Sequence, residues 1–193
     1  MLCGITLIAG LALSGIFAMT EETIEEQKAM AAAESYKEVL ADAESFQTND
    51  AMDSAIAALE GGTYGTDFGK VTINEAFEGV DGSGNVVGYA ISVTSGDGFD
   101  GNITMAVGIT ADGTVTGISF TELNETAGMG MRVDEDAFKG QFVGRNVSAF
   151  VLNKAGGSTS DEEIDSVSGA SISSSAVVNA VNAALDFFAS NAN

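Results

Sequence analysis

Histidine, proline and tryptophan are absent from the 193-residue sequence, and cysteine occurs once, at Cys3. A single cysteine excludes an intrachain disulfide, an iron–sulfur cluster held by protein thiolates and a cysteine-based zinc site. The absence of histidine removes the usual base of a serine hydrolase and the commonest ligand of haem and transition metals. We therefore expect no metal site. Without proline, turns depend on Asn, Asp and the 24 glycines.

Basic residues are also scarce, with seven Lys and Arg against 28 Asp and Glu and a net charge of −21. Proteins bind the phosphates of nucleic acids through clustered Lys and Arg, so we expect no nucleic-acid partner. The same charge suits a soluble body that is held away from an anionic membrane surface.

Charge is absent altogether from residues 2–19, which read LCGITLIAGLALSGIFAM. A helix of this length spans about 27 Å at ~1.5 Å per residue, close to the ~30 Å hydrocarbon core of a bilayer. We predict a transmembrane anchor over residues 1–19. The alternative is a cleaved signal peptide, which the lack of a basic leading region and the poor cleavage pattern disfavour.

The remainder of the chain predicts one α+β domain, with an antiparallel sheet and flanking helices. Helix formers dominate residues 20–46 and 50–60, so we interpret 20–60 as a helical linker and the start of the domain. Alternating apolar residues predict strands at 86–94, 102–110 and 114–122, with a turn at 111–113 and a bulge at Gly117.

The last third of the chain has a less regular pattern. Residues 134–138 favour a helical turn, 146–152 an extended segment and 153–163 a flexible surface connection. Apolar residues at helical spacing over 173–189 predict an amphipathic closing helix.

Six serines crowd the fourteen residues 165–178, DSVSGASISSSAVV, at the start of that helix. Capping by Ser171, Ser173 or Ser174 would explain one of them. A hydrolase nucleophile lacks both the G-x-S-x-G pattern and a histidine base, which leaves only a Ser–Lys pair with Lys154. A phosphate cradle is chemically sound, because Gly169 and a helix N-terminus present N–H groups to an anion. The fourth alternative is a point of covalent attachment.

The string DSVSGASIS resembles the flavinylation motif D-x-x-[ST]-G-A-[ST]-x-[ST] of an FMN-binding domain. This domain occurs in the G subunit of the Rnf electron-transport complex and in the C subunit of the sodium-pumping NADH:quinone reductase. The resemblance implies a phosphoester between FMN and Ser171, the hydroxyl residue after Gly-Ala, installed by a flavin transferase. It further implies that the transferase recognises Asp165, Gly169 and Ala170. The neighbouring motif residues would bind the cofactor or cap the helix: Ser168, Gly169, Ala170, Ser173 and Ser174.

A second stretch, ETAGMG at 125–130, is similar to the E-T-P-G-x-G segment near the flavin in the Rnf G subunit, with Ala127 in place of proline. The resemblance implies cofactor contacts from Glu125, Thr126, Gly128, Met129 and Gly130. Nearby cations, among them Arg132, Lys139, Arg145 and Lys154, would either neutralise the phosphate or the reduced flavin or form ordinary surface ion pairs.

The similarity to the Rnf G subunit covers nearly the whole chain and makes residues 61–193 the FMN-binding domain. It implies an electron-relay subunit, without catalytic residues of its own, in a complex that couples electron flow between ferredoxin and NAD to Na⁺ or H⁺ transport. The implied partners are the A, B, C, D and E subunits, above all the D subunit with its own covalent flavin, and a flavin transferase. The implied location is the inner or plasma membrane, with one span and an extracytoplasmic domain. The alternative is a membrane-anchored adhesion or scaffold module without a cofactor.

Overall fold

The computed structural model describes residues 30–59, 61–65 and 67–192, so the predicted anchor at 1–19 lies outside the described residues. Ser35–Asn193 form one compact unit, which holds every strand and helix that carries a label.

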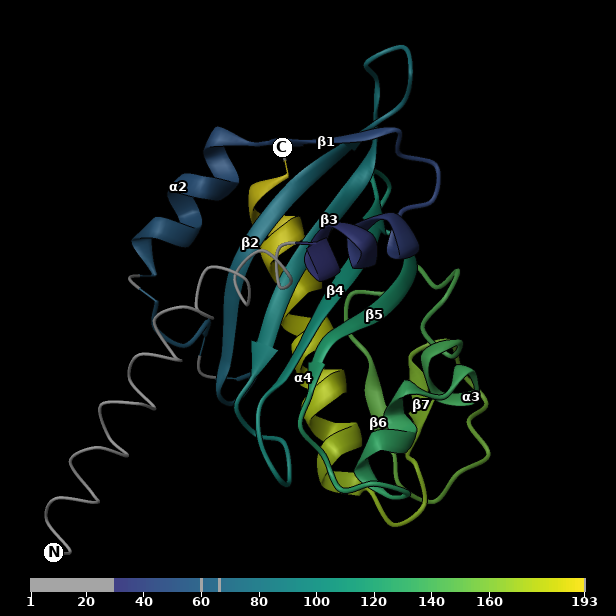
Figure 1. Cartoon of the computed structure of the whole chain (residues 1–193). Helices are drawn as coiled ribbons and strands as arrows, with labels where there is room; N and C mark the ends of the chain where they lie inside the picture. Colours follow the sequence, from purple (N-terminus) through teal and green to yellow (C-terminus); the bar gives the residue numbers. More distant parts are fainter. Residues whose placement is uncertain (1–29, 60, 66, 193) are drawn as a thin grey trace, which may run out of the picture. The chain divides into compact units, whose positions relative to one another are not determined.

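A sheet of five antiparallel strands, in the order β1-β2-β3-β4-β5, forms the centre of this unit (Figure 1). Each strand pairs with the next in the chain, which makes the sheet a meander. The strands are β1 Ser45–Thr48, β2 Val71–Val80, β3 Val86–Ser95, β4 Ile103–Thr110 and β5 Val115–Leu123. The α+β class and the three predicted strands are confirmed, the latter to within one residue at each end.

Two strands of this sheet were not predicted from the residue pattern. Residues 45 and 46 were expected to be helical but begin β1, and β2 was not predicted at all. In β2 a register shift between Ile73 and Glu75 breaks the alternation of buried and exposed residues. The bulge predicted at Gly117 is present, because the β4–β5 register skips the adjacent Thr116.

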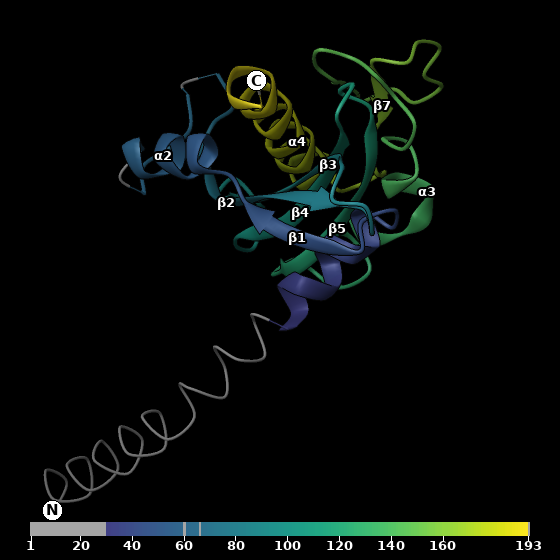
Figure 2. The same ribbon diagram turned by 90° about the horizontal axis from the view of Figure 1, so that it is seen from above.

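The two faces of the sheet carry different elements, as the view from above shows (Figure 2). Helix α4, Ser171–Asn191, lies along one face and supplies the core with small and branched side chains such as Val177, Val181 and Ala184. Among the described residues it is the one helix long and apolar enough to span a membrane, but most of it is buried in the domain. The predicted closing helix at 173–189 is therefore confirmed and extends two residues further at each end.

The opposite face carries the end of a helical segment at 30–39, and three glycines make room for it. We call Gly79, Gly88 and Gly108, from three adjacent strands, the glycine patch. A Cβ atom at Gly79 would overlap the Leu40 side chain, and one at Gly108 would overlap the Val39 carbonyl oxygen. The chain therefore approaches the sheet more closely than any larger residue would permit.

Two side chains fasten this segment to the sheet. The Thr116 hydroxyl at the bulge donates a hydrogen bond to the Val39 carbonyl oxygen, and the Tyr36 hydroxyl donates to the Glu75 carboxylate. Burial, together with the neighbouring carboxylate, raises the pKa of Tyr36 well above its ordinary value, so the phenol keeps its proton.

Short elements complete the unit. Helix α2, Asp50–Ala58, confirms the helix predicted at 50–60 and is capped by the Asn49 side chain. The predicted helical turn near 134–138 is present as a 3₁₀ helix, Gly130–Asp134, followed by α3, Asp136–Lys139. Strands β6, Val151–Asn153, and β7, Glu163–Asp165, form a parallel pair, so the predicted extended segment at 146–152 becomes a strand only at its end.

Candidate functional site

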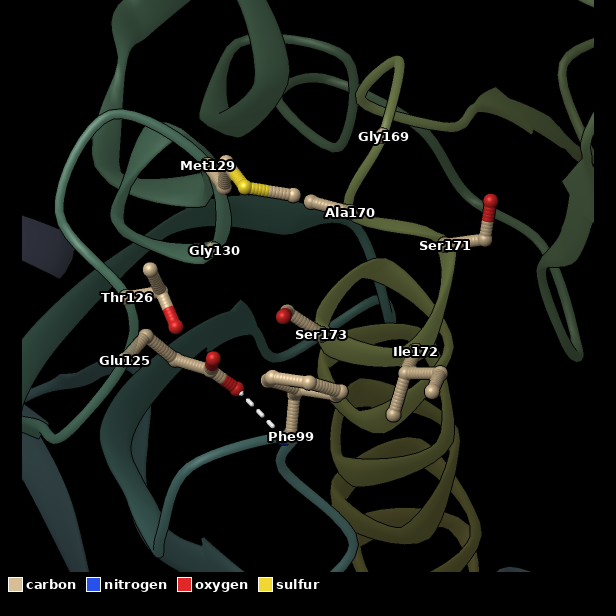
Figure 3. A pocket seen from close by; sticks show the side chains of 10 residues that line it. All are labelled: Phe99, Glu125, Thr126, Met129, Gly130, Gly169, Ala170, Ser171, Ile172 and Ser173. Carbon is tan, nitrogen blue, oxygen red and sulfur yellow. Dashed lines mark hydrogen bonds between the residues drawn. The ribbon is translucent and has the colours of Figure 1, made fainter.

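A cavity of about 270 Å³ opens at one end of the sheet (Figure 3). Three segments line it: the β3–β4 loop, the chain that follows β5, and the first turn of α4 with the residues before it. The lining residues are Phe99, Glu125, Thr126, Met129, Gly130, Gly169, Ala170, Ser171, Ile172 and Ser173. The volume is close to the lower end of the ~300–1,000 Å³ range of small-ligand sites.

The topology explains why these segments meet. In an antiparallel meander the β3–β4 loop and the chain after β5 leave the sheet at the same end, and the N-terminus of α4 lies there as well (Figure 1). Gly128 and Gly169 have φ of +76° and +81°, a left-handed conformation that glycine adopts without strain. The turns at these two glycines bring the neighbouring motif residues to the wall of the cavity.

Most of the residues predicted for the cofactor are brought together here. Eight of them line the cavity: Glu125, Thr126, Met129, Gly130, Gly169, Ala170, Ser171 and Ser173. Gly128, Ser168 and Ser174 do not line it. Two lining residues were missed, Phe99 and Ile172, and both side chains are more than half exposed. The sequence offers one indication that Phe99 could contact a ligand: it is an aromatic residue within GDGFDG, a stretch whose Gly and Asp residues favour turns.

Glu125 is the buried carboxylate of the site, with 8% of its surface exposed. Its Oε1 accepts a hydrogen bond of 2.7 Å from the Phe99 backbone N–H, which fixes the β3–β4 loop against the chain that follows β5. Its Oε2 has no hydrogen-bond partner among the described residues. A Cβ atom at Gly130 would overlap this carboxylate, so glycine is required there for Glu125 to occupy its place.

The serines do not cap α4, which corrects one expectation. The N-cap residue is Ala170, and no side chain makes a capping hydrogen bond to it or to the first turn of the helix. Ser174 instead bonds across the preceding turn: its Oγ accepts from the Val167 N–H at 3.1 Å and donates to the Ala170 carbonyl oxygen at 2.9 Å. Because Ser174 is fully buried in these contacts, its hydroxyl serves the turn rather than a ligand.

Ser171 and Ser173 face different directions (Figure 3). The Ser173 hydroxyl points into the cavity, whereas the Ser171 hydroxyl points away from it. Ser171 Oγ accepts a long hydrogen bond of 3.4 Å from Ser166 Oγ. Rotation of χ1 to another staggered position would turn the Ser171 hydroxyl without moving the backbone.

Asp165, the first residue of the flavinylation motif, organises the loop before it. Its carboxylate accepts hydrogen bonds from the N–H groups of Gly157 and Ser158, at 2.9 and 3.0 Å, and from the Ser158 hydroxyl. The Ser158 hydroxyl first, then the two N–H groups and the charge of Arg145, hold the pKa of Asp165 below its ordinary value. The surface connection predicted to be flexible is thus tied to the motif at this point.

Asp165→Asn is expected to speed hydrogen exchange at Gly157 and Ser158 several-fold at neutral pH, because an amide offers one oxygen where the carboxylate offers two. In the parent the folded pKa lies below the unfolded value of 3.8, so the stabilisation is complete above that pH and is lost as the pH falls through the folded pKa. Asp161→Asn, on the same exposed loop, is the control. Unchanged exchange in Asp165→Asn would contradict this role.

None of the four cations singled out in the sequence lines the cavity. Arg132 pairs with Glu135 at 3.1 Å, Lys139 pairs with Asp134 at 2.8 Å, and Arg145 donates to backbone carbonyl groups of the 160–163 turn. For these three residues the structure therefore favours the second of the two roles considered, that of ordinary surface contacts.

Comparison with known proteins points to the part of the chain that contains the cavity. Residues 98–186, which include every cavity residue, match the family model of the FMN-binding domain. The chain is 30% identical to the G subunit of the Na(+)-translocating ferredoxin:NAD(+) oxidoreductase complex of Acetobacterium woodii, over 95% of this chain and 86% of the relative. It is 41% identical to the G subunit of the ion-translocating oxidoreductase complex of Methanosarcina acetivorans, over 58% of this chain and 56% of the relative.

A solved structure supports the fold. The crystal structure of Shewanella oneidensis NqrC is similar with a TM-score of 0.50 and 19% identity, over 74% of this chain and 65% of that chain. At this identity the likeness concerns the fold alone.

Proposed function

The chain belongs to the G-subunit family of ion-translocating oxidoreductase complexes, and from this premise we propose that it carries FMN covalently on Ser171 and relays electrons within such a complex. Its FMN-binding domain and its membership in an oxidoreductase complex are family properties. The covalent bond, its position and the relay between ferredoxin and NAD are the proposal.

One observation carries the proposal: two motif stretches that are far apart in the chain, within 125–130 and 165–173, line one cavity at the N-terminus of α4. A helix N-terminus bears a partial positive charge, which stabilises the anionic phosphodiester that attachment at Ser171 would create. No lysine or arginine lines the cavity, so the helix end is the source of positive potential that the described residues offer there.

The cavity also fits the other end of the cofactor. Phe99, Met129 and Ile172 present large apolar surfaces around it, and each is more than half exposed. A flat flavin ring would cover these side chains and remove their apolar surface from water. FMN supplies the electron-transfer chemistry, while this chain holds the phosphate and the ring.

The surroundings of Ser171 suggest that a separate enzyme makes the bond. A serine becomes a nucleophile when a neighbouring base accepts its proton. Among the described residues its hydroxyl has one hydrogen-bond partner, Ser166, which is not a base. A flavin transferase that supplies the base, and that reads Asp165, Gly169 and Ala170, is therefore part of the proposal.

The test of this function is the state of the purified chain. Produced together with a flavin transferase, it should keep flavin fluorescence after denaturation and gain the mass of one FMN less one water. An adhesion or scaffold module would carry no flavin. A colourless chain of unmodified mass would refute the proposal.

Membership in an ion-translocating complex implies association with a membrane. We further propose that residues 1–19 span it once and that the domain lies on the extracytoplasmic side. The proposed partners are the A, B, C, D and E subunits of the complex, and the D subunit would exchange electrons with this chain.

The proposed side of the membrane predicts that a cysteine introduced at Ser160, an exposed loop residue, reacts with an impermeant thiol reagent in intact cells once any outer barrier is opened. The parent chain, whose single cysteine is Cys3, is the matched control. Labelling only after the inner membrane is lysed would place the domain on the cytoplasmic side.

A further inference from the structure

Two polar side chains, Glu125 and Ser173, face each other across the cavity (Figure 3). Glu125 Oε2 is the one buried side-chain oxygen or nitrogen among the described residues that lacks a hydrogen bond. Ser173 is 1% exposed, and its hydroxyl points into the cavity (Figure 3). Buried polar groups are nearly always hydrogen-bonded, so Glu125 Oε2 indicates a ligand that completes it, and the Ser173 hydroxyl points into the same cavity.

The surrounding backbone is shaped to keep the Glu125 carboxylate in this position. Its Oε1 is held by the Phe99 N–H, and Gly130 leaves the space that the carboxylate fills. A carboxylate oxygen is an acceptor only, so the ligand must offer an N–H or O–H group at Oε2. The serine hydroxyl opposite can donate as well as accept.

The charge of Glu125 is not balanced by another side chain in the cavity. The other lining residues are uncharged, and the nearby Arg132 is paired with Glu135 on the exposed surface. A negative charge in a largely apolar, partly enclosed site acts on a bound group more strongly than it would in water. It therefore disfavours the addition of negative charge to whatever lies next to it.

We propose that Glu125 Oε2 accepts a hydrogen bond from the imide N–H of the flavin ring, that Ser173 Oγ donates to an adjacent ring carbonyl, and that Glu125 lowers the midpoint potential of the flavin. This inference rests on the function proposed above and assigns the ring end of the site. Glu125 is then a positioning and tuning residue, and the two side chains shift the potential in opposite directions. The carboxylate opposes the electron density that reduction places on the ring, while the hydroxyl stabilises it.

Glu125→Gln separates this role from a purely structural one. The glutamine carbonyl oxygen can still accept from the Phe99 N–H, but this turns the amide NH₂ into the cavity, where it would meet the ring N–H as a second donor. A structural role would be rescued by glutamine, whereas a role toward the flavin would not. Glu122→Gln, which changes an exposed carboxylate three residues away, controls for the change in net charge.

In the full chain loaded with covalent flavin, Glu125→Gln is expected to raise the midpoint potential and to shift the visible absorption of the ring. A hydrogen bond to a charged group changes the equilibrium between oxidised and reduced flavin about tenfold. Covalent flavin, measured as fluorescence after denaturation, should stay at the parent level, and Glu122→Gln should match the parent throughout. Ser173→Ala, which places a good helix former in α4, should lower the potential.

The following outcomes would overturn the proposed role of Glu125 and Ser173. A Glu125→Gln chain with covalent flavin and the parent's spectrum and potential overturns this inference and leaves the proposed function standing. Equal shifts in Glu125→Gln and Glu122→Gln overturn it too, because they would reflect net charge alone. If Glu125→Gln does not fold, Ser173→Ala decides, and an unchanged potential there counts against the arrangement. A parent chain without flavin overturns both proposals.

Discussion

Ser171→Ala is expected to abolish covalent flavin on the chain, from a full complement to background, whereas Ser171→Thr should retain it. Alanine has no oxygen from which a phosphoester can form, and threonine offers the hydroxyl that the motif also admits. The measurement is flavin fluorescence of the denatured chain after production with a flavin transferase, together with its mass.

The loss of covalent flavin in Ser171→Ala should result from the missing hydroxyl and not from a failure of the chain to fold. Ser171 is partly exposed and caps nothing, so its replacement by alanine should change the free energy of unfolding by no more than about 0.5 kcal/mol. Ser175→Ala, one turn further along α4 and outside the motif, is the matched control and should stay fully flavinylated. Flavin persisting on Ser171→Ala would move the attachment to another hydroxyl, with Ser166 the nearest candidate at 3.4 Å.

Gly108→Ala is expected to destabilise the domain by about 1–3 kcal/mol, the usual cost of overpacking a well-packed site. The new Cβ would overlap the Val39 carbonyl oxygen and the Thr116 hydroxyl, the two partners of one hydrogen bond. Backbone cannot rotate out of the way as a flexible side chain can, so the 35–40 segment must lift from the sheet. Thermal or urea unfolding of the purified chain measures the change.

Gly117→Ala is the internal comparison, because Gly117 pairs directly with Gly108 across β4 and β5. A Cβ there would lie 3.8 Å from Val39 Cα, an ordinary van der Waals distance. The same substitution in the same sheet should therefore be tolerated. Equal destabilisation by both variants would show that general loss of strand glycine, and not contact with residues 35–40, sets the cost.

The elements predicted most accurately from the sequence are those in which a regular spacing of apolar residues determines the structure. Strands β3, β4 and β5 alternate cleanly, whereas β2 contains a register shift and exposed acidic residues that hide its period. β1 forms because it pairs with β2, so helix-forming residues in its neighbourhood misled the prediction.

For the site, the motif resemblance located both stretches but not their partners. Phe99 is brought to the cavity by tertiary packing, which leaves no motif in the sequence, and Ile172 occupies a position of the motif where any residue is allowed. Nor does a serine near a helix start reveal which backbone group it will bond. Ser174 bonds back to the Val167 turn, although the residue pattern suggested a cap just as well.

The attachment of the 35–40 segment to the glycine patch also fixes where the chain enters the domain. Tyr36 is hydrogen-bonded to β2 and Val39 to β5, so the chain is fixed at its entry to the sheet, without slack. The cavity is built on the far end of the same strands. The entry of the chain and the proposed FMN site therefore lie at opposite ends of the sheet in one compact unit, Ser35–Asn193.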